Sequence, residues 1–113
     1  MMASAIRERY LRDPLPIRLG GLAADMARIA SWSENAANRA VVASLLEEGK
    51  YFAEWAAPEA PINVQAVLAD VQIQLAYWHR RWLAGQAEPR MRNDAQHWSD
   101  ELLALSGLAS SER

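Results

Sequence analysis

Three side chains near the C-terminal end of the chain have the types and spacing that could bind a metal ion. Asp94, His97 and Glu101 are three and four residues apart, so they would share one face of a helix. A two-metal site in a helical bundle takes an acidic-x-x-His pair from each of two helices, and here only Asp94 and His97 form such a pair. We therefore expect no metal ion and no cofactor, and interpret these side chains as a solvated helix flank.

The same stretch contains an arginine and a histidine that could act together on a phosphodiester. Arg92-Asn93-Asp94-Ala95-Gln96-His97 resembles the Arg-x4-His motif of HEPN-family ribonucleases, whose helical domains dimerise around a shared cleft. The resemblance implies that Arg92 stabilises phosphate charge, that His97 acts on the ribose hydroxyl as acid or base, and that Asn93 supports them. This ribonuclease is the alternative to our main hypothesis, a protein without catalytic residues.

Tryptophan is abundant, with 5 in 113 residues, and the helices assigned below bring four of them toward one end of the molecule. Polar side chains that could orient a ligand in an apolar cleft fall at the same end: Asn35, Asn38, Arg39, His79, Arg80, Arg81, Arg90, Arg92 and His97. The sequence thus gives a second alternative, a site for a small apolar ligand formed by Trp32, Trp78, His79, Trp82 and Trp98. The other interpretation is that these rings fill the wide end of a helical core.

Charge and motif content exclude several classes of function. The chain has 12 basic and 14 acidic groups, a formal net charge of −2, so no overall field draws it toward nucleic acid or anionic lipid. It has no cysteine, which excludes disulfides and thiolate chemistry. It also has no Gly-rich phosphate loop, no His-Glu-x-x-His and no Gly-x-Ser-x-Gly. We expect neither a nucleic-acid partner nor a membrane.

Composition indicates one all-α domain over residues 1–113. With 51% apolar and 23% charged residues the chain is close to globular averages, and its 22 alanines favour helix over strand. Apolar residues recur at steps of three and four along four stretches, which predict helices near 17–33, 35–57, 62–84 and 89–106. The expected stripes are Leu15, Leu19, Leu22, Met26 and Ile29; then Val41, Val42, Leu45, Phe52 and Ala56; then Val64, Leu68, Val71, Leu75, Trp78 and Trp82; and finally Met91, Ala95, Trp98, Leu102 and Leu105.

Short connections between these helices favour antiparallel neighbours, because a short loop cannot return the chain to the far end of a helix. We therefore expect an up-and-down antiparallel four-helix bundle over residues 17–107. Residues 1–14 form an N-terminal arm, helical or extended, which Pro14 and Pro16 separate from the first bundle helix.

The predicted helix near 62–84 is apolar on two opposite sides. Its second side consists of Ile62, Ala66, Ala69, Ile73 and Tyr77, which one bundle core cannot also cover. The helix near 17–33 shows a weaker form of this pattern, with Gly20, Ala24, Ala27 and Ser31 opposite its core stripe. We predict a homodimer through the first of these faces, with another protein as a possible partner. The alternative is that the alanines only support helicity and that the face is solvated.

The N-terminal sequence MMASAIRERYLRD has charges where a secretory signal needs an apolar run, so we expect a cytoplasmic protein. The stretches RLGGLAADMARIASWSENAANR, LLEEGKYFAEWAAPEA and QLAYWHRRW resemble small all-helical bacterial proteins. That resemblance implies a stand-alone bacterial protein and no particular reaction. The sequence therefore predicts a non-catalytic, homodimeric interaction or scaffold module.

Overall fold

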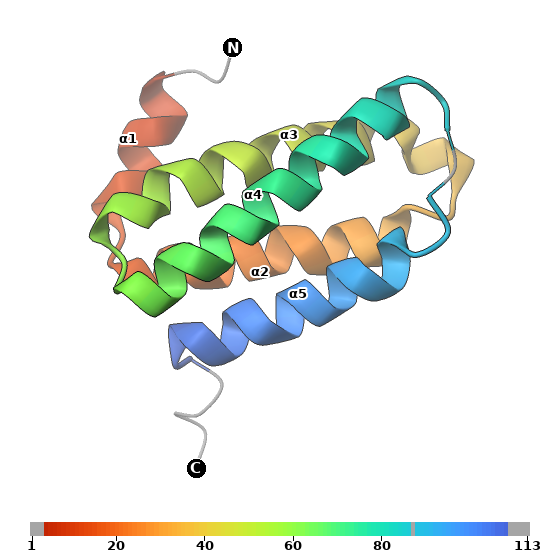
Figure 1. The fold of residues 1–113 in the computed structure, drawn as a ribbon. Helices are drawn as coiled ribbons and strands as arrows, with labels where there is room; N and C mark the ends of the chain where they lie inside the picture. The colour runs from red at the N-terminus through yellow and green to blue at the C-terminus, as the bar shows by residue number, and fades with distance from the viewer. Residues whose placement is uncertain (1–3, 87, 109–113) are drawn as a thin grey trace.

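The computed structural model describes residues 4–86 and 88–108 of the chain. The described part is 86% helical and contains no strand, which confirms the all-α prediction. Its elements are α1 (Ser4–Arg12), α2 (Leu15–Trp32), the 3-10 turn η1 (Ala36–Asn38), α3 (Arg39–Ala56), the 3-10 turn η2 (Ala57–Glu59), α4 (Ile62–Leu83) and α5 (Met91–Ser106) (Figure 1). No helix in these residues combines the length and the mean hydropathy needed to cross a lipid bilayer.

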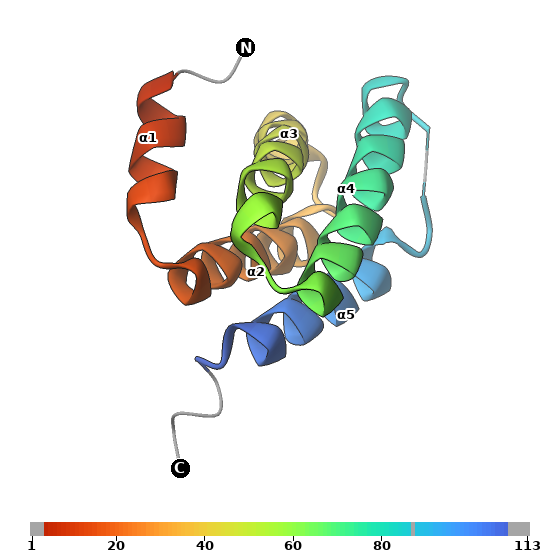
Figure 2. The same cartoon turned by 60° about the vertical axis from the view of Figure 1, so that its left-hand side comes forward.

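The axes of the four longer helices, α2 to α5, are roughly aligned with one another, and α1 lies to one side of these four (Figures 1 and 2). Helices α2 and α3 run in opposite directions, as do α3 and α4, and α5 runs back along α2 (Figure 1). Helix α2 packs most extensively against α5, and α3 packs against both α2 and α4. In contrast, α4 and α5 have few contacts although they follow each other in the chain, which leaves an open edge between them.

All helix boundaries but one, the start of α3, agree with the sequence prediction to within two residues, and the shifts have local causes. Helix α2 begins at Leu15 because Pro14 is the extended N-cap and Pro16 lies in the first turn, where its missing N–H costs nothing. Helix α3 begins at Arg39 because η1 occupies the first predicted turn. The side chain of Asn35 caps that turn by accepting a hydrogen bond from the Ala37 N–H at 2.9 Å.

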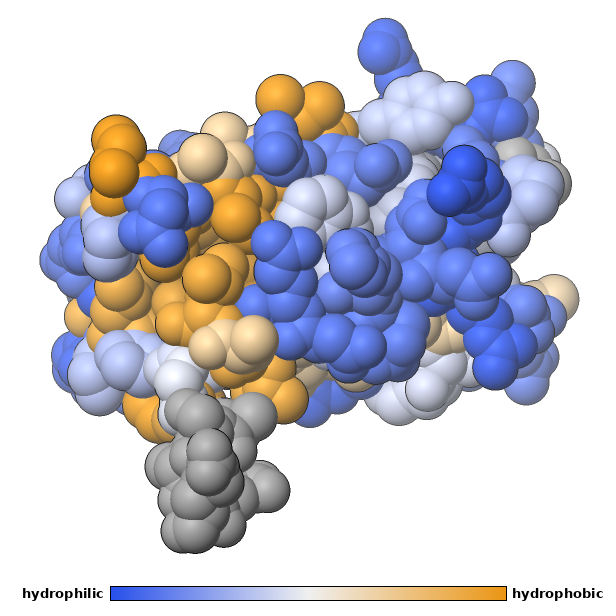
Figure 3. Space-filling model, turned by 60° about the horizontal axis from the view of Figure 1, so that its bottom comes forward, coloured by the Kyte–Doolittle hydropathy of each residue, from blue (hydrophilic) through white to orange (hydrophobic). Residues whose placement is uncertain are grey.

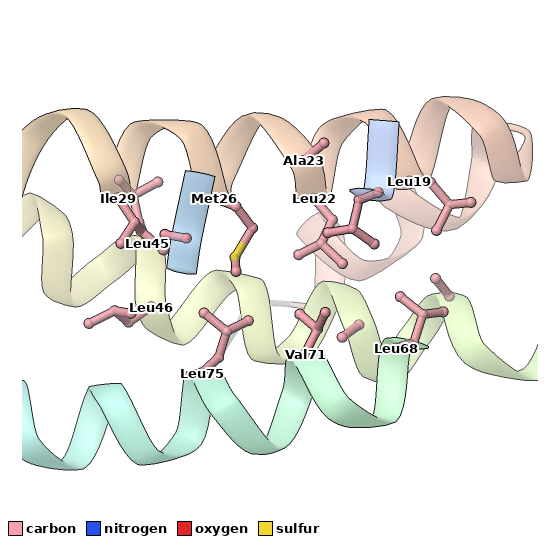
Figure 4. Packing of buried hydrophobic residues seen from close by; sticks show 14 of the residues in the cluster. Leu19, Leu22, Ala23, Met26, Ile29, Leu45, Leu46, Leu68, Val71 and Leu75 are labelled. Atoms are coloured by element: carbon pink, nitrogen blue, oxygen red, sulfur yellow. The ribbon is translucent and has the colours of Figure 1, made fainter. Parts of the chain in front are cut away.

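The core lies between α2, α3 and α4, where leucine, isoleucine, valine and methionine side chains point toward one another (Figure 4). Leu22, Met26, Leu68, Val71 and Leu75 are all fully buried, as their spacing predicted. One assignment was wrong: Val41 is exposed, and its neighbour Val42 is the buried residue. The two differ by 100° around the helix, so only one of them can face the core.

Part of α2 with small residues lies close to α5 and to the turn that follows it. The Ser99 hydroxyl on α5 donates a hydrogen bond to the Ala23 carbonyl oxygen at 2.8 Å. A Cβ added at Gly20 would lie 2.8 Å from Leu108 Cδ1, so the absence of a side chain there allows the close approach. The weaker second face expected on this helix is therefore partly used within the fold.

Helix α1 is held by Tyr10, whose ring stacks on Phe52 of α3 with centroids 4.0 Å apart. The Tyr10 hydroxyl donates to the Arg18 carbonyl oxygen at 3.0 Å, and burial raises the pKa of this hydroxyl above its ordinary value. Arg18 is itself buried; its Nε donates to the Asp13 carbonyl oxygen at 2.9 Å, and its guanidinium pairs with Glu59. These contacts join α1, the start of α2 and η2.

Candidate functional site

The outer face of α4, which we define as Ile62, Ala66, Ala69, Ile73 and Tyr77, is exposed along its whole length. Ile62, Ile73 and Tyr77 retain 81%, 69% and 49% of their accessible surface. The opposite side of the helix is buried in the core, so α4 is apolar on two sides, as the sequence indicated. Isolated apolar side chains on a surface are ordinary, but a row of them along four turns of one helix is not.

Beside this face lies the α4–α5 groove, a hollow of about 470 Å³ lined by Asp70, Ile73, Gln74, Tyr77 and Trp98. It follows directly from the sparse packing between the two helices. Viewed from this side, apolar side chains gather over one half of the surface and polar ones over the other (Figure 3). The groove shares Ile73 and Tyr77 with the outer face of α4 and adds the ring of Trp98 to it.

The four tryptophans expected to gather at one end do not form a single site. Trp78 is buried in the core, Trp32 is exposed at the end of α2, and Trp98 lines the α4–α5 groove. His79 lies near Lys50 and Glu47 of α3, and burial, together with the charge of Lys50, lowers its pKa. Of the predicted ligand residues, only Trp82 lines a hollow at the loop end of the molecule.

That loop-end hollow, of about 340 Å³, has walls that are both polar and apolar, including Glu34, Arg39, Trp82 and Arg92. The Arg39 guanidinium lies 5.2 Å from the centre of the Trp82 ring, and Trp82 Nε1 donates to the Arg39 carbonyl oxygen at 3.0 Å. Arg92 pairs with Glu34 at 2.6 Å. The hollow therefore brings Trp82 together with Arg39 and Arg92, as the sequence predicted, but without Trp32, Trp78, His79 or Trp98.

Arg92 and His97 do not share a partner. Arg92 pairs with Glu34, whereas His97 Nε2 lies 3.7 Å from a carboxylate oxygen of Glu101. Residues five apart on a helix differ by about 140° in direction, which accounts for the separation. Within one chain the pair therefore has no common reaction centre, and Asn93 is exposed beside it.

The side chains considered as metal ligands have other partners. Asp94 lies 3.9 Å from the Arg90 guanidinium, and Glu101 is the neighbour of His97. Among residues 4–86 and 88–108, no group of three histidine, aspartate or glutamate side chains is placed to hold a metal ion.

A hollow that the sequence analysis missed lies between α1, α2 and α3. Its volume is about 370 Å³, and its walls are Ile6, Arg9, Tyr10, Asp13, Ile17, Gly21, Glu48 and Phe52. We call it the α1 hollow. It depends on the placement of α1 by the Tyr10–Phe52 stack, a contact between residues 42 positions apart that no local pattern reveals.

Asp25, at 1% exposure, lies next to the carboxyl group of Glu48, one of the residues that line this hollow. Its Oδ1 accepts from Arg28 at 3.2 Å, while no N–H or hydroxyl of the described residues donates to Oδ2. Burial, followed by the bond to Glu48 and the charge of Glu48, raises the pKa of Asp25 well above its ordinary range. The sequence did contain a signal, because Asp25 is three residues after Leu22 and four before Ile29, on the apolar side of α2.

Comparison of the chain with protein-family models, curated proteins and solved structures finds no match.

Proposed function

We propose that this chain is a cytoplasmic bacterial protein without catalytic activity that works as a homodimer through the outer face of α4. In this proposal α2 to α5 form an up-and-down four-helix bundle that is open between α4 and α5. The observation that carries it is the exposure of Ile62, Ile73 and Tyr77 along a helix whose other side is buried. Burying such a row against a partner would stabilise the complex by about 25 cal/mol for each Å² of apolar surface removed from water.

A second copy is the occupant that the order of residues favours. If two α4 helices pair antiparallel about the midpoint between Ala69 and Asp70, Ala66 of each copy lies beside Ile73 of the other. Ile62 then lies beside Tyr77, so large side chains fill the space left by small ones at the centre and meet one another at the ends. In a parallel pair each residue would lie beside the same residue of the other copy. Isoleucine would then meet isoleucine and alanine would meet alanine, which leaves gaps between the alanines.

The size of the surface indicates a weak dimer. Helix α4 has 22 residues and is about 33 Å long, which is enough for one helix pair. The area that one helix pair buries is less than the roughly 800 Å² per partner of a standard stable interface. The neighbouring α4–α5 groove, with Trp98 and Tyr77 in its walls, can accept side chains of the second copy and enlarge the contact. We expect a dimer that dissociates on dilution into the low micromolar range.

Sedimentation equilibrium over a dilution series tests the proposal. Ile73→Arg places a charge at the centre of the contact and should give a folded monomer, since the position is solvent-exposed in one chain. Leu83→Arg is the matched control: Leu83 is on the same helix and 64% exposed, but it lies outside the outer face. It should leave the dimer intact. A wild-type monomer at high micromolar concentration, or equal effects of the two variants, would end the proposal.

A further inference from the structure

The α1 hollow has the size and walls of a site for a small molecule. Ile6, Ile17 and Phe52 give it apolar sides, and its volume is about 370 Å³, within the range of small-ligand pockets. A Cβ added at Gly21 would meet no atom within 4 Å, so this wall is open to the cavity. The hollow is formed by α1, α2 and α3 and is separate from the outer face of α4.

The charges around the hollow leave one carboxylate without a cation. Arg9 and Asp13 both line it, and their formal charges cancel. Glu48 also lines it, and it forms no ion pair among residues 4–86 and 88–108. A carboxylate beside apolar walls is costly unless a positive group accompanies it.

A second carboxyl group, that of Asp25, is buried next to Glu48. It has lost nearly all contact with water, and Arg28 reaches only its Oδ1. Its Oδ2 has no donor from the described residues, so the carboxyl group of Glu48 is the neighbour left to it. Two carboxyl groups can hydrogen-bond only when one holds a proton, so the pair carries one negative charge. The hollow thus combines apolar walls with one acidic pair.

We propose that the α1 hollow binds a small organic cation: a protonated amine attached to an apolar body. The ammonium group donates hydrogen bonds to Glu48, on the wall of the cavity, and the apolar body contacts Ile6, Ile17 and Phe52. Asp25 keeps its proton and its bond to Glu48, so binding needs no other change of charge. A neutral ligand lacks the charge-assisted bond, and an anionic ligand is repelled by Glu48.

Titration of the full chain with phenethylamine, followed by amide NMR shifts, tests this inference. Phenethyl alcohol and 3-phenylpropanoate are the neutral and anionic controls of similar size. We expect saturable shifts at Tyr10, Gly21 and Glu48 with the amine, binding about tenfold weaker with the alcohol, and none with the carboxylate, because a hydrogen bond to a charged group is worth about one order of magnitude in affinity. Equal binding of all three probes, or no saturable shift with the amine, would overturn the proposal.

Two variants locate the site. Glu48→Gln removes the charge but keeps a side chain that can bond to Asp25, and it should weaken amine binding about tenfold. Glu54→Gln, at an exposed position of the same helix, is the control and should change nothing. Gly21→Leu should fill the hollow and abolish binding in a protein that still folds, since the added Cβ meets open space. Undiminished binding in both folded variants would contradict the assignment, whatever the outcome of the dimer experiment.

Discussion

Asp25 of α2 and Glu48 of α3 have neighbouring carboxyl groups, with Asp25 buried and Glu48 on the wall of the α1 hollow. Burial and the neighbouring Glu48 carboxyl raise the pKa of Asp25, so we expect Asp25 to hold a proton that it can donate to Glu48.

The first prediction follows from the sign of this shift. In the unfolded chain Asp25 ionises near its ordinary pKa of 3.8, whereas in the folded chain it keeps its proton to higher pH. The folded state therefore becomes less stable as pH rises from about 4 through neutrality. Its free energy of unfolding falls by at most about 1.4 kcal/mol per pH unit. Urea denaturation at several pH values measures this dependence.

Asp25→Asn should remove the effect. The amide needs no proton to donate to Glu48, so we expect stabilisation of about 1–3 kcal/mol at pH 7 or above and almost none near pH 4. Asp100→Asn, at an exposed position, is the control and should leave the pH dependence unchanged. If wild type and Asp25→Asn have parallel stability curves across this range, Asp25 is not protonated in the folded protein.

The second prediction compares two glycines within helices. At Gly21 an added Cβ meets nothing, so Gly21→Ala should stabilise the protein by about 0.5–1 kcal/mol through helix propensity. At Gly49 the added Cβ would lie 2.9 Å from Leu75 Cδ1 in the packed core. Gly49→Val should therefore destabilise by about 1–3 kcal/mol through overpacking between α3 and α4. Thermal unfolding checks both; the same sign for both variants would contradict the packing described here.

The third prediction concerns the register of the proposed dimer. Antiparallel pairing about the midpoint between Ala69 and Asp70 brings the two Asp70 carboxylates near the two-fold axis, where like charges repel. We expect Asp70→Asn to tighten the dimer several-fold, and added salt to do the same for the wild type but less for the variant. Sedimentation equilibrium gives both constants. A dimer that Asp70→Asn weakens has a different register.

The fourth prediction separates the non-catalytic proposal from the ribonuclease alternative. Because Arg92 and His97 face different carboxylates, we expect the purified protein to leave RNA intact. His97→Ala should change stability by no more than about 0.5 kcal/mol, since the imidazole is exposed. RNA cleavage by the wild type that is lost in His97→Ala would instead support the alternative, with the pair completed by a second copy.

Periodicity predicted the buried side of each longer helix because burial and spacing are coupled within one element. Leu68, Val71 and Leu75 point the same way on any α-helix, whatever surrounds it. Periodicity alone did not choose between Val41 and Val42, since adjacent residues differ by one step around the helix. It also did not show that α5 would pack on α2 and leave α4 uncovered, which depends on the close approach at Gly20 and Ala23.

The α1 hollow was beyond sequence reasoning for a different reason. Its walls come from three helices, and the contact that closes it joins Tyr10 to Phe52 across a long stretch of chain. Asp25 was visible as a charge on an apolar stripe, yet its meaning depended on Glu48 being opposite, which only the packing of α2 against α3 determines. Tertiary contacts of this kind leave no local pattern.

The attachment of α1 makes one wall of the α1 hollow the part that detaches most easily. Helix α1 has its main packing contacts with α3 alone and is joined to α2 through the short Asp13–Pro14 link. An element with so few contacts detaches at a much lower free energy than the core unfolds. Amide protons of Tyr10 and Leu11 should therefore exchange faster than that of Leu22, with little dependence on denaturant. A molecule in the hollow would contact α1 and slow that exchange, so binding there would strengthen the attachment of the helix.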